Sequence, residues 1–197
     1  MNFIEPNRLL PFYEYRLQKN AFLTKDGKKI LFLLLTFLEM NTNEETIAKF
    51  YTAFSNGNAD QMCECYHPNI RFRDPVFGLL KGGEVCKMWS MLLEKSRGNI
   101  KIEFSEIKAG DHTGTAHWTA TYNFSKTNRK VVNSIYAHFQ FQDGLILKHT
   151  DDFDIWKWAK QAFGWKGVLL GWTGFMQKKI HQQALSALKN YKKQKDN

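Results

Sequence analysis

Three ionisable side chains could carry chemistry, because they fall where the sequence otherwise predicts an apolar interior: Asp74, His149 and Asp151. Asp74 ends one predicted strand. His149 and Asp151 lie two residues apart on another, so both side chains point to the same face of the sheet. Apolar surroundings raise the pKa of a carboxyl group, which can then serve as a general acid or base near neutral pH. His149 could orient Asp151 or exchange a proton with it.

Each of these residues also has a structural interpretation. Asp74 precedes Pro75, and an Asp in that position commonly caps a turn. His149 and Asp151 could instead form a buried hydrogen bond to a neighbouring strand or helix. Two polar residues together on an apolar face favour a site over a purely structural pair. We therefore predict that Asp74, His149 and Asp151 are catalytic.

The sequence contains no phosphate-binding loop, no dinucleotide-binding glycine pattern and no serine-hydrolase motif. The histidines are scattered, and His112 and His117 lie across a turn and a strand, so metal binding is only weakly supported. We expect no metal ion and no cofactor.

The hairpin that carries His149 and Asp151 consists of two predicted strands, over 131–142 and 145–153, and a three-residue loop with Gly144 in the left-handed position. This register pairs Ala137 with His149 and Ile135 with Asp151. The remaining residues of that face are all apolar: Phe139, Phe141, Leu145, Leu147 and Phe153. A shift by one residue would destroy the apolar face, which supports the predicted alternation.

The elements before and after the hairpin follow from hydrophobic spacing and from turn residues. Helices are predicted over 44–55, 59–66, 84–94, 155–163 and 175–192, strands over 69–73, 100–109 and 114–125, and a loop over 77–83. Helices followed by a run of strands indicate an α+β fold, with three helices packed on one face of a curved antiparallel sheet.

Charge is distributed unevenly along the 197 residues. The net charge is +9, but residues 40–154 contribute −1 and residues 155–197 contribute +8. A nucleic-acid-binding domain would spread basic side chains over its own face, so we expect no nucleic-acid partner. The basic end is better explained as a solvated helix face that docks on the domain than as a membrane-binding helix.

We divide the chain into an N-terminal extension over 1–39, a pocket domain over 40–163 and a basic C-terminal helical extension over 164–197. Met40 resembles a natural start, so residues 1–39 are interpreted as a spurious or poorly ordered arm. Their apolar run over 30–38 is too short to span a bilayer, which takes about 20 residues. The glycine-broken segment over 164–172 is predicted to pack on the domain or to form a dimer contact, rather than a lid.

Cys63, Cys65 and Cys86 are the only cysteines. Their odd number and their spacing match neither a disulfide framework nor a zinc site. We expect reduced thiols in a cytoplasmic protein.

Two segments resemble a known family. Residues 48–78 (AKFYTAFSNGNADQMCECYHPNIRFRDPVFG) are similar to the opening of ketosteroid isomerases and SnoaL-like polyketide cyclases of the nuclear transport factor 2-like superfamily. Residues 141–158 (FQDGLILKHTDDFDIWKW) resemble the last hairpin of that family, which limonene epoxide hydrolases share. The resemblance implies a cone-shaped sheet around three helices, open at one end, and a homodimer formed through the outer face of the sheet.

The resemblance also implies roles for individual residues. Asp74 falls where ketosteroid isomerases hold the proton-shuttling base, and Asp151 where the epoxide hydrolases hold a catalytic Asp. Phe50, beside Tyr51, replaces the oxyanion-hole Tyr of the isomerases, and Ala137 replaces their second donor. These departures argue against steroid isomerisation, because the oxyanion donors supply much of the catalysis. The Arg-x-Asp pair of the epoxide hydrolases has no counterpart in the strand over 114–125, which argues against epoxide hydrolysis.

We therefore expect a conical pocket for a small hydrophobic molecule. Its predicted walls are aromatic: Phe50, Tyr51, Phe54, Trp89, Trp118 and Phe139. The first functional hypothesis is proton-transfer chemistry of the isomerase or cyclase type by Asp74, His149 and Asp151. The alternative is a non-catalytic module of the same fold, for ligand binding or dimerisation.

Overall fold

The computed structural model describes residues 43–195, and the statements below apply to that range. The predictions for the N-terminal extension over 1–39, and for a natural start at Met40, lie outside the described residues. None of the helices within 43–195 is long and apolar enough to cross a lipid bilayer.

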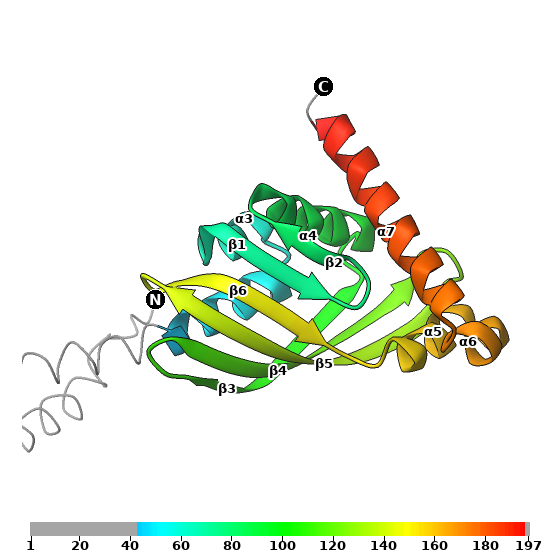
Figure 1. Ribbon diagram of the computed structural model, residues 1–197, viewed down its shortest axis with the longest axis horizontal. Helices are drawn as coiled ribbons and strands as arrows, with labels where there is room; N and C mark the ends of the chain where they lie inside the picture. Colours follow the sequence, from blue (N-terminus) through cyan, green and yellow to red (C-terminus); the bar gives the residue numbers. More distant parts are fainter. Residues whose placement is uncertain (1–42, 196–197) are drawn as a thin grey trace, which may run out of the picture. The chain divides into compact units, whose positions relative to one another are not determined.

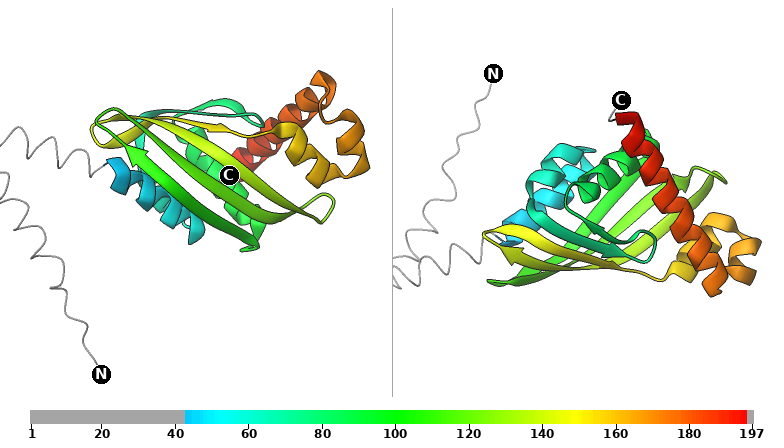
Figure 2. Two further views of the ribbon diagram at one scale, coloured as in Figure 1. Left: turned by 90° about the horizontal axis from the view of Figure 1, so that it is seen from below. Right: turned by 45° about the horizontal axis from the view of Figure 1, so that its top comes forward.

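A single curved sheet of six strands forms the framework, with the strand order β2-β1-β6-β5-β4-β3 (Figures 1 and 2). The strands are β1 Tyr66–Asp74, β2 Gly78–Lys81, β3 Ile100–Ala109, β4 Thr113–Phe124, β5 Arg129–Gln142 and β6 Leu145–Asp152. Neighbouring strands are antiparallel except β1 and β6, which are parallel. The predicted α+β architecture is confirmed, with this one parallel pair as a refinement.

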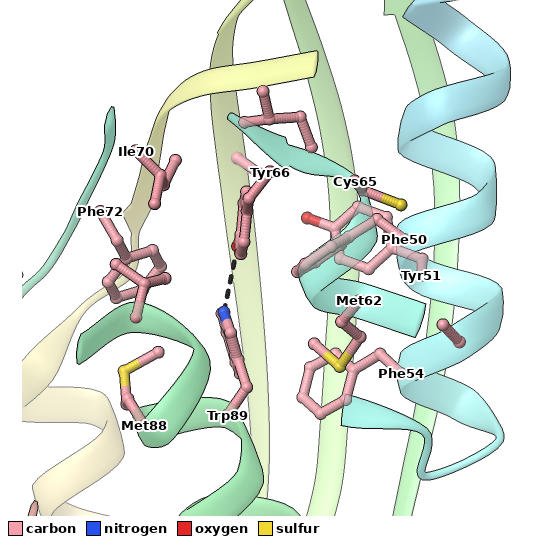
Figure 3. Close-up of a cluster of buried hydrophobic side chains, with 14 of the residues drawn as sticks. Phe50, Tyr51, Phe54, Met62, Cys65, Tyr66, Ile70, Phe72, Met88 and Trp89 are labelled. Carbon is pink, nitrogen blue, oxygen red and sulfur yellow. Dashed lines mark hydrogen bonds between the residues drawn. The ribbon is translucent and has the colours of Figure 1, made fainter. Parts of the chain in front are cut away.

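Three helices lie against the inner face of the sheet: residues 43–55, α3 (Ala59–Glu64) and α4 (Gly83–Ser96). The first has the predicted apolar stripe, in which Ile47, Phe50 and Phe54 recur at helical spacing and are buried. The Asn58 side chain caps α3 by accepting a hydrogen bond from the Gln61 amide. Figure 3 shows how aromatic and sulfur-containing side chains of these helices fill the core beside β1.

Three further helices follow the sheet: α5 (Ile155–Phe163), α6 (Trp165–Leu170) and α7 (Gly174–Lys195). The long α7 runs back towards α4 (Figures 1 and 2). The Tyr191 hydroxyl donates to Glu94 over 2.6 Å, and Lys192 pairs with Glu84 at 2.7 Å. These contacts confirm that the basic helix docks on the domain.

The predicted loop over 77–83 is wrong in part, since it contains β2. Leu80 pairs with Phe72 of β1 and is buried, while its neighbours Leu79 and Lys81 are exposed. The strand is only four residues long and has glycines on both sides, so its alternation is too short to separate it from a turn.

The predicted hairpin register is also wrong, by two residues. Asp143 and Gly144 form a two-residue turn with φ of 53° and 73°, as a type I′ turn requires, and Ala137 pairs with Asp151 rather than with His149. Opposite Gln140 and Phe141, β6 has a bulge in which Leu147 has no partner, and this turns Ile146, rather than Leu145, into the core. Because the error is an even number of residues, His149 and Asp151 keep their inward positions.

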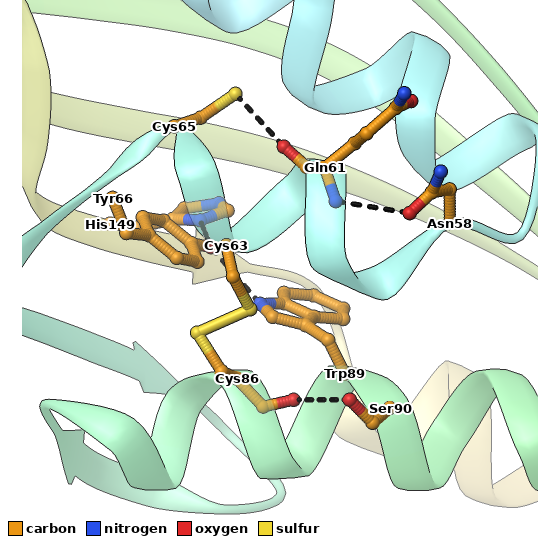
Figure 4. The surroundings of a disulfide bond; sticks show 9 residues. All are labelled: Asn58, Gln61, Cys63, Cys65, Tyr66, Cys86, Trp89, Ser90 and His149. Atoms are coloured by element: carbon orange, nitrogen blue, oxygen red, sulfur yellow. Dashed lines mark hydrogen bonds between the residues drawn. A yellow bond between two sulfur atoms is a disulfide. The ribbon is translucent and has the colours of Figure 1, made fainter.

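The expectation of three reduced thiols is contradicted by a disulfide between Cys63 and Cys86 (Figure 4). Cys63 lies near the end of α3 and Cys86 in the first turn of α4, and packing of these helices brings their Cα atoms to 5.6 Å. Cys65 remains a free, buried thiol. The pairing depends on helix packing, which cysteine spacing in the sequence does not reveal.

Candidate functional site

A chain of buried hydrogen bonds connects the helices to the last strand. Trp89 of α4 donates through Nε1 to the Tyr66 hydroxyl over 3.0 Å, and that hydroxyl lies 2.8 Å from Nδ1 of His149 (Figures 3 and 4). His149 Nε2 lies 3.0 Å from Oδ1 of Asp151, which also accepts a bond from Trp118 Nε1 over 3.1 Å. His149 is 0% exposed and Asp151 is 4% exposed.

Donor and acceptor roles along this chain follow from chemistry. The indole nitrogen of Trp89 can only donate, so the Tyr66 oxygen accepts from it and directs its own proton to Nδ1 of His149. We therefore assign the remaining ring proton to Nε2, which donates it to Asp151. Asp151 thus receives two N–H bonds on one oxygen, from His149 and Trp118, and its carboxylate is fixed in position.

Asp151 and Asp74 both line a cavity of about 300 Å³ between the sheet, α4, α5 and α7. The rest of the wall is mainly aromatic and aliphatic. It includes Phe54, Phe72, Trp89, Trp118, Ala120, Tyr122, Phe153, Trp158, Ile180 and Ala184. The volume lies at the lower end of the range for small-molecule sites, and the apolar wall with a few polar groups is typical of them.

Asp74 is held at the end of β1 by the turn that follows it. Its Oδ1 accepts hydrogen bonds from the backbone amides of Val76, at 3.0 Å, and of Phe77. Burial raises the pKa of Asp74 to about 7; the Phe77 amide opposes the rise and the negative charge of Asp151 adds to it. The predicted turn cap and the predicted place beside the pocket are therefore two roles of one residue.

The tyrosine Tyr122 of β4 adds a polar group to the cavity wall. Its hydroxyl accepts a hydrogen bond from Trp158 Nε1 over 2.8 Å, so its own proton is available to a ligand. Burial raises the pKa of Tyr122, which keeps that proton on the oxygen near neutral pH.

The residues predicted to form the site divide into two groups. Asp74, Asp151, Phe54, Trp89 and Trp118 line the cavity. The other four are buried but do not line it: Phe50, Tyr51, Phe139 and His149.

These four residues form a layer behind the cavity wall. The rings of Phe50 and Phe139 pack on His149 at centroid distances of 5.4 and 4.5 Å. The Tyr51 hydroxyl is the one buried side-chain polar atom within residues 43–195 that lacks a hydrogen-bond partner. Burial raises its pKa well above the usual value, and the charge of Asp151 adds to this. His149 is connected to the cavity by its hydrogen bond to Asp151.

Sequence reasoning missed Tyr66, Tyr122 and the α7 wall. Tyr66 was predicted to end a helix, whereas it begins β1 and points inward. Tyr122 lies at an inner-face position of β4, four residues after Trp118, and that spacing could have identified it. Nothing in the sequence indicated that α7 would complete the wall with Ile180 and Ala184.

Within the part of the chain that the structure describes, no three His, Cys, Asp or Glu side chains come together in a way that could hold a metal ion.

Several solved structures share this fold. TerC, crystallised with polyporic acid, superposes with a TM-score of 0.55 at 15% identity, over 62% of this chain and 99% of TerC. A SnoaL-like polyketide cyclase candidate from Jannaschia sp. CCS1 gives 0.56 at 12% identity, over 64% and 94% of the two chains. An NTF2-like protein of unknown function from Burkholderia pseudomallei K96243 gives 0.53 at 14% identity, over 61% and 97%. These similarities establish the NTF2-like fold.

No curated protein matches the sequence significantly. The family model of the SnoaL-like domain, by contrast, matches residues 47–149. The match extends from the first helix of the core to His149 on β6, and thus includes Asp74 and most of the sheet that forms the cavity. The chain belongs to the SnoaL-like domain family.

Proposed function

We propose that this protein binds a small, mainly apolar molecule in its cavity and transfers a proton on it, in chemistry of the isomerase or cyclase type. The observation that carries the proposal is the presence of two carboxylates, Asp74 and Asp151, in different environments on the wall of one apolar cavity. Two titratable groups in unlike surroundings are the usual basis for dividing acid–base roles.

In this proposal, Asp74 is the group that takes and returns the proton. With a pKa of about 7, it is present in both protonation states at neutral pH, which suits a general acid–base catalyst. Its turn holds the carboxyl group in place through the amides of Val76 and Phe77. A proton on a carbon next to a carbonyl group is the kind of proton that such a base removes.

Asp151 and Tyr122 would orient the ligand. Asp151 is fixed by His149 and Trp118 and can accept a hydrogen bond from a ligand hydroxyl group. Tyr122 can donate its proton to a ligand carbonyl, where negative charge develops as the neighbouring carbon is deprotonated. Tyr122 would thus supply a donor that Phe50 and Ala137, at the oxyanion positions of the isomerases, lack.

The ligand is expected to be a ring compound with a carbonyl group and a hydroxyl group. The apolar wall favours rings, and Asp74, Asp151 and Tyr122 favour oxygen substituents. The family comparison supports this class, because relatives of the same fold include polyketide cyclase candidates and a protein crystallised with polyporic acid.

A ligand screen tests binding. Thermal shifts would be recorded with a panel of aromatic and polycyclic hydroxyketones for the wild type, for Asp74→Asn and Asp151→Asn, and for Asp152→Asn as the control. Asp152 is exposed and follows Asp151 on the same strand, so its replacement should leave every shift unchanged. We expect at least one compound to stabilise the wild type and to stabilise Asp151→Asn less. If no compound stabilises the wild type, the cavity has no ligand of this class.

Hydrogen exchange tests catalysis. With a compound that binds, nuclear magnetic resonance in heavy water would follow exchange of the hydrogen next to its carbonyl group. We expect the wild type to accelerate this exchange, Asp74→Asn to abolish the acceleration, and Tyr122→Phe to reduce it about a hundredfold. Binding without accelerated exchange would support the alternative, a non-catalytic ligand-binding module.

A further inference from the structure

The surface formed by α6 and the start of α7 is strongly apolar. Six side chains make up this apolar cap, and all are exposed: Trp165, Val168, Leu169, Leu170, Trp172 and Phe175. Trp165 is 69% exposed and Phe175 is 73% exposed. Such a patch is unusual for a monomeric surface and marks an interaction site. The sequence analysis predicted that this segment packs on the domain or forms a dimer contact; it contacts α5 through Gly167, and these six side chains stay exposed.

The outward orientation of the cap results from two glycines. A Cβ atom on Gly167 would overlap the carbonyl group of Ala159, and one on Gly171 would come within 2.9 Å of the Ala159 Cβ and 3.0 Å of the Trp156 ring. α6 therefore packs on α5 through its backbone, and its large side chains point away from the domain. The Trp156 indole donates to the Val168 carbonyl over 3.3 Å and ties the two helices together. The apolar cap is thus held in place by the fold.

Basic side chains surround the cap. Residues 155–195 contain nine lysines and no Asp or Glu. Two of these lysines, Lys192 and Lys195, pair with Glu84 and Glu94 of α4. The five nearest to the cap in sequence have no ion-pair partner among the described residues: Lys157, Lys160, Lys166, Lys178 and Lys179.

Two of these lysines lie over indole rings. The Lys160 ammonium lies 4.0 Å from the centre of the Trp156 ring, and that of Lys166 lies 5.6 Å from the Trp165 ring. This arrangement places positive charge beside the indole rings. Tryptophan and lysine occur together in this way where a protein meets the boundary between lipid headgroups and acyl chains.

We propose that the apolar cap docks on an anionic lipid surface, with its aromatic and aliphatic side chains in the interfacial layer and the surrounding lysines on the headgroups. Each lysine near an anionic bilayer adds to binding, as does each buried apolar side chain. A second copy of this chain fits the surface less well, because residues 155–195 contain no Asp or Glu and a two-fold contact at the cap would bring lysines against lysines.

Vesicle co-sedimentation of the full chain tests the proposal. We expect binding to vesicles of phosphatidylcholine mixed with phosphatidylglycerol, weaker binding to phosphatidylcholine alone, and loss of binding at high salt. Leu169→Ser combined with Trp172→Ser should weaken binding at least about tenfold, and Lys166→Gln combined with Lys178→Gln about tenfold. All four side chains are exposed, so these variants should fold, which circular dichroism would verify.

The matched control is Val132→Ser combined with Tyr136→Ser. Both residues are exposed side chains on β5 that do not belong to the apolar cap, and their replacement should leave vesicle binding unchanged. The proposal fails if the full chain ignores anionic vesicles, or if the cap variant binds them as tightly as the wild type. It also fails if light scattering shows a dimer for the wild type and a monomer for the variant Leu169→Ser with Trp172→Ser, while vesicle binding is the same for both. None of these measurements involves a cavity ligand, so their outcome is separate from that of the proposed function.

Discussion

The interior of the molecule has two halves: a filled half, closely packed around His149, and a hollow half, which contains the cavity. Strand β6 passes from one to the other. In the filled half, Ile146 and His149 are fully buried, and the rings of Phe50 and Phe139 pack on His149. In the hollow half, Asp151 and the half-buried Phe153 line the cavity.

The two halves differ in how fully their polar side chains are hydrogen-bonded within the protein. The filled half satisfies Tyr66 and His149 through a closed set of hydrogen bonds, to which Trp89 of the cavity wall contributes one donor. The hollow half leaves Asp74 and Tyr122 with capacity for a ligand. Asp151 belongs to both halves, because it is held from the filled half by His149 and faces the cavity. Chemistry is therefore expected at the boundary, and the filled half serves to position it.

Replacement of His149, at the centre of the filled half, should have the largest effect on stability. His149→Leu keeps a similar volume, but in the core it leaves the Tyr66 hydroxyl proton without an acceptor and the Asp151 carboxylate without one of its two N–H donors. We therefore expect a loss of about 4 kcal/mol in the free energy of unfolding. Urea denaturation would measure it. His138→Leu, at an exposed position of β5, should change the free energy little. A loss below about 1 kcal/mol for His149→Leu would contradict the role given to this network.

The disulfide should have the next largest effect. It joins α3 to α4 beside the filled half and closes a chain segment with a sequence separation of 23. Cross-links of this length stabilise by restricting the unfolded chain, so reduction or Cys86→Ser should cost about 3 kcal/mol in urea denaturation. Cys65→Ala is the control for loss of a buried thiol outside the cross-link, and it should cost less. Equal unfolding midpoints for the oxidised and reduced proteins would show that the bond contributes no stability.

A matched pair on β4 compares the two halves directly. Ala116 and Ala120 are both buried on the inner face, but only Ala120 lines the cavity. Ala116→Leu must force extra volume into packed surroundings and should cost about 2 kcal/mol. Ala120→Leu can extend into the cavity and should change the free energy of unfolding by less than about 0.5 kcal/mol. Equal costs, measured by urea denaturation, would mean that the interior is not divided in this way.

The sequence predicted the elements and faces of the fold well, because these depend on local periodicity. His149 and Asp151 were placed inward by the two-residue alternation of a strand, and this survived an error of two residues in the register. Asp74 was identified as an ionisable residue at the end of a predicted strand, and the turn before which it was expected to act as a cap also sets it at the cavity.

The depth of each residue along the interior could not be predicted in the same way. Phe50, Tyr51 and Phe139 share a face with cavity-lining residues but lie in the filled half. Periodicity gives the face of a strand or helix, whereas the filled and hollow regions depend on the curvature of the sheet and on where α7 docks. The partners of Asp151 and the disulfide likewise depend on contacts between elements distant in sequence.

The smallest expected effect is the pH dependence of stability that arises from Asp74 in the hollow half. The pKa of Asp74 in the folded protein, about 7, lies above its ordinary value of 3.8, so the folded state binds this proton more tightly than the unfolded chain. Charged Asp74 therefore costs stability, and the cost should grow as pH rises from about 4 to about 7 and then level off.

Asp74→Asn retains the acceptor for the Val76 and Phe77 amides but removes the charge. Its free energy of unfolding should therefore rise relative to that of the wild type across the window from pH 4 to 7, on the order of 1 kcal/mol for this partly solvated group. Urea denaturation at a series of pH values would measure the difference, with the exposed Asp152→Asn as control. Parallel pH profiles for Asp74→Asn and the wild type would mean that water or a counter-charge already stabilises the carboxylate. Asp74 would then be too weak a base at neutral pH for the proposed proton transfer.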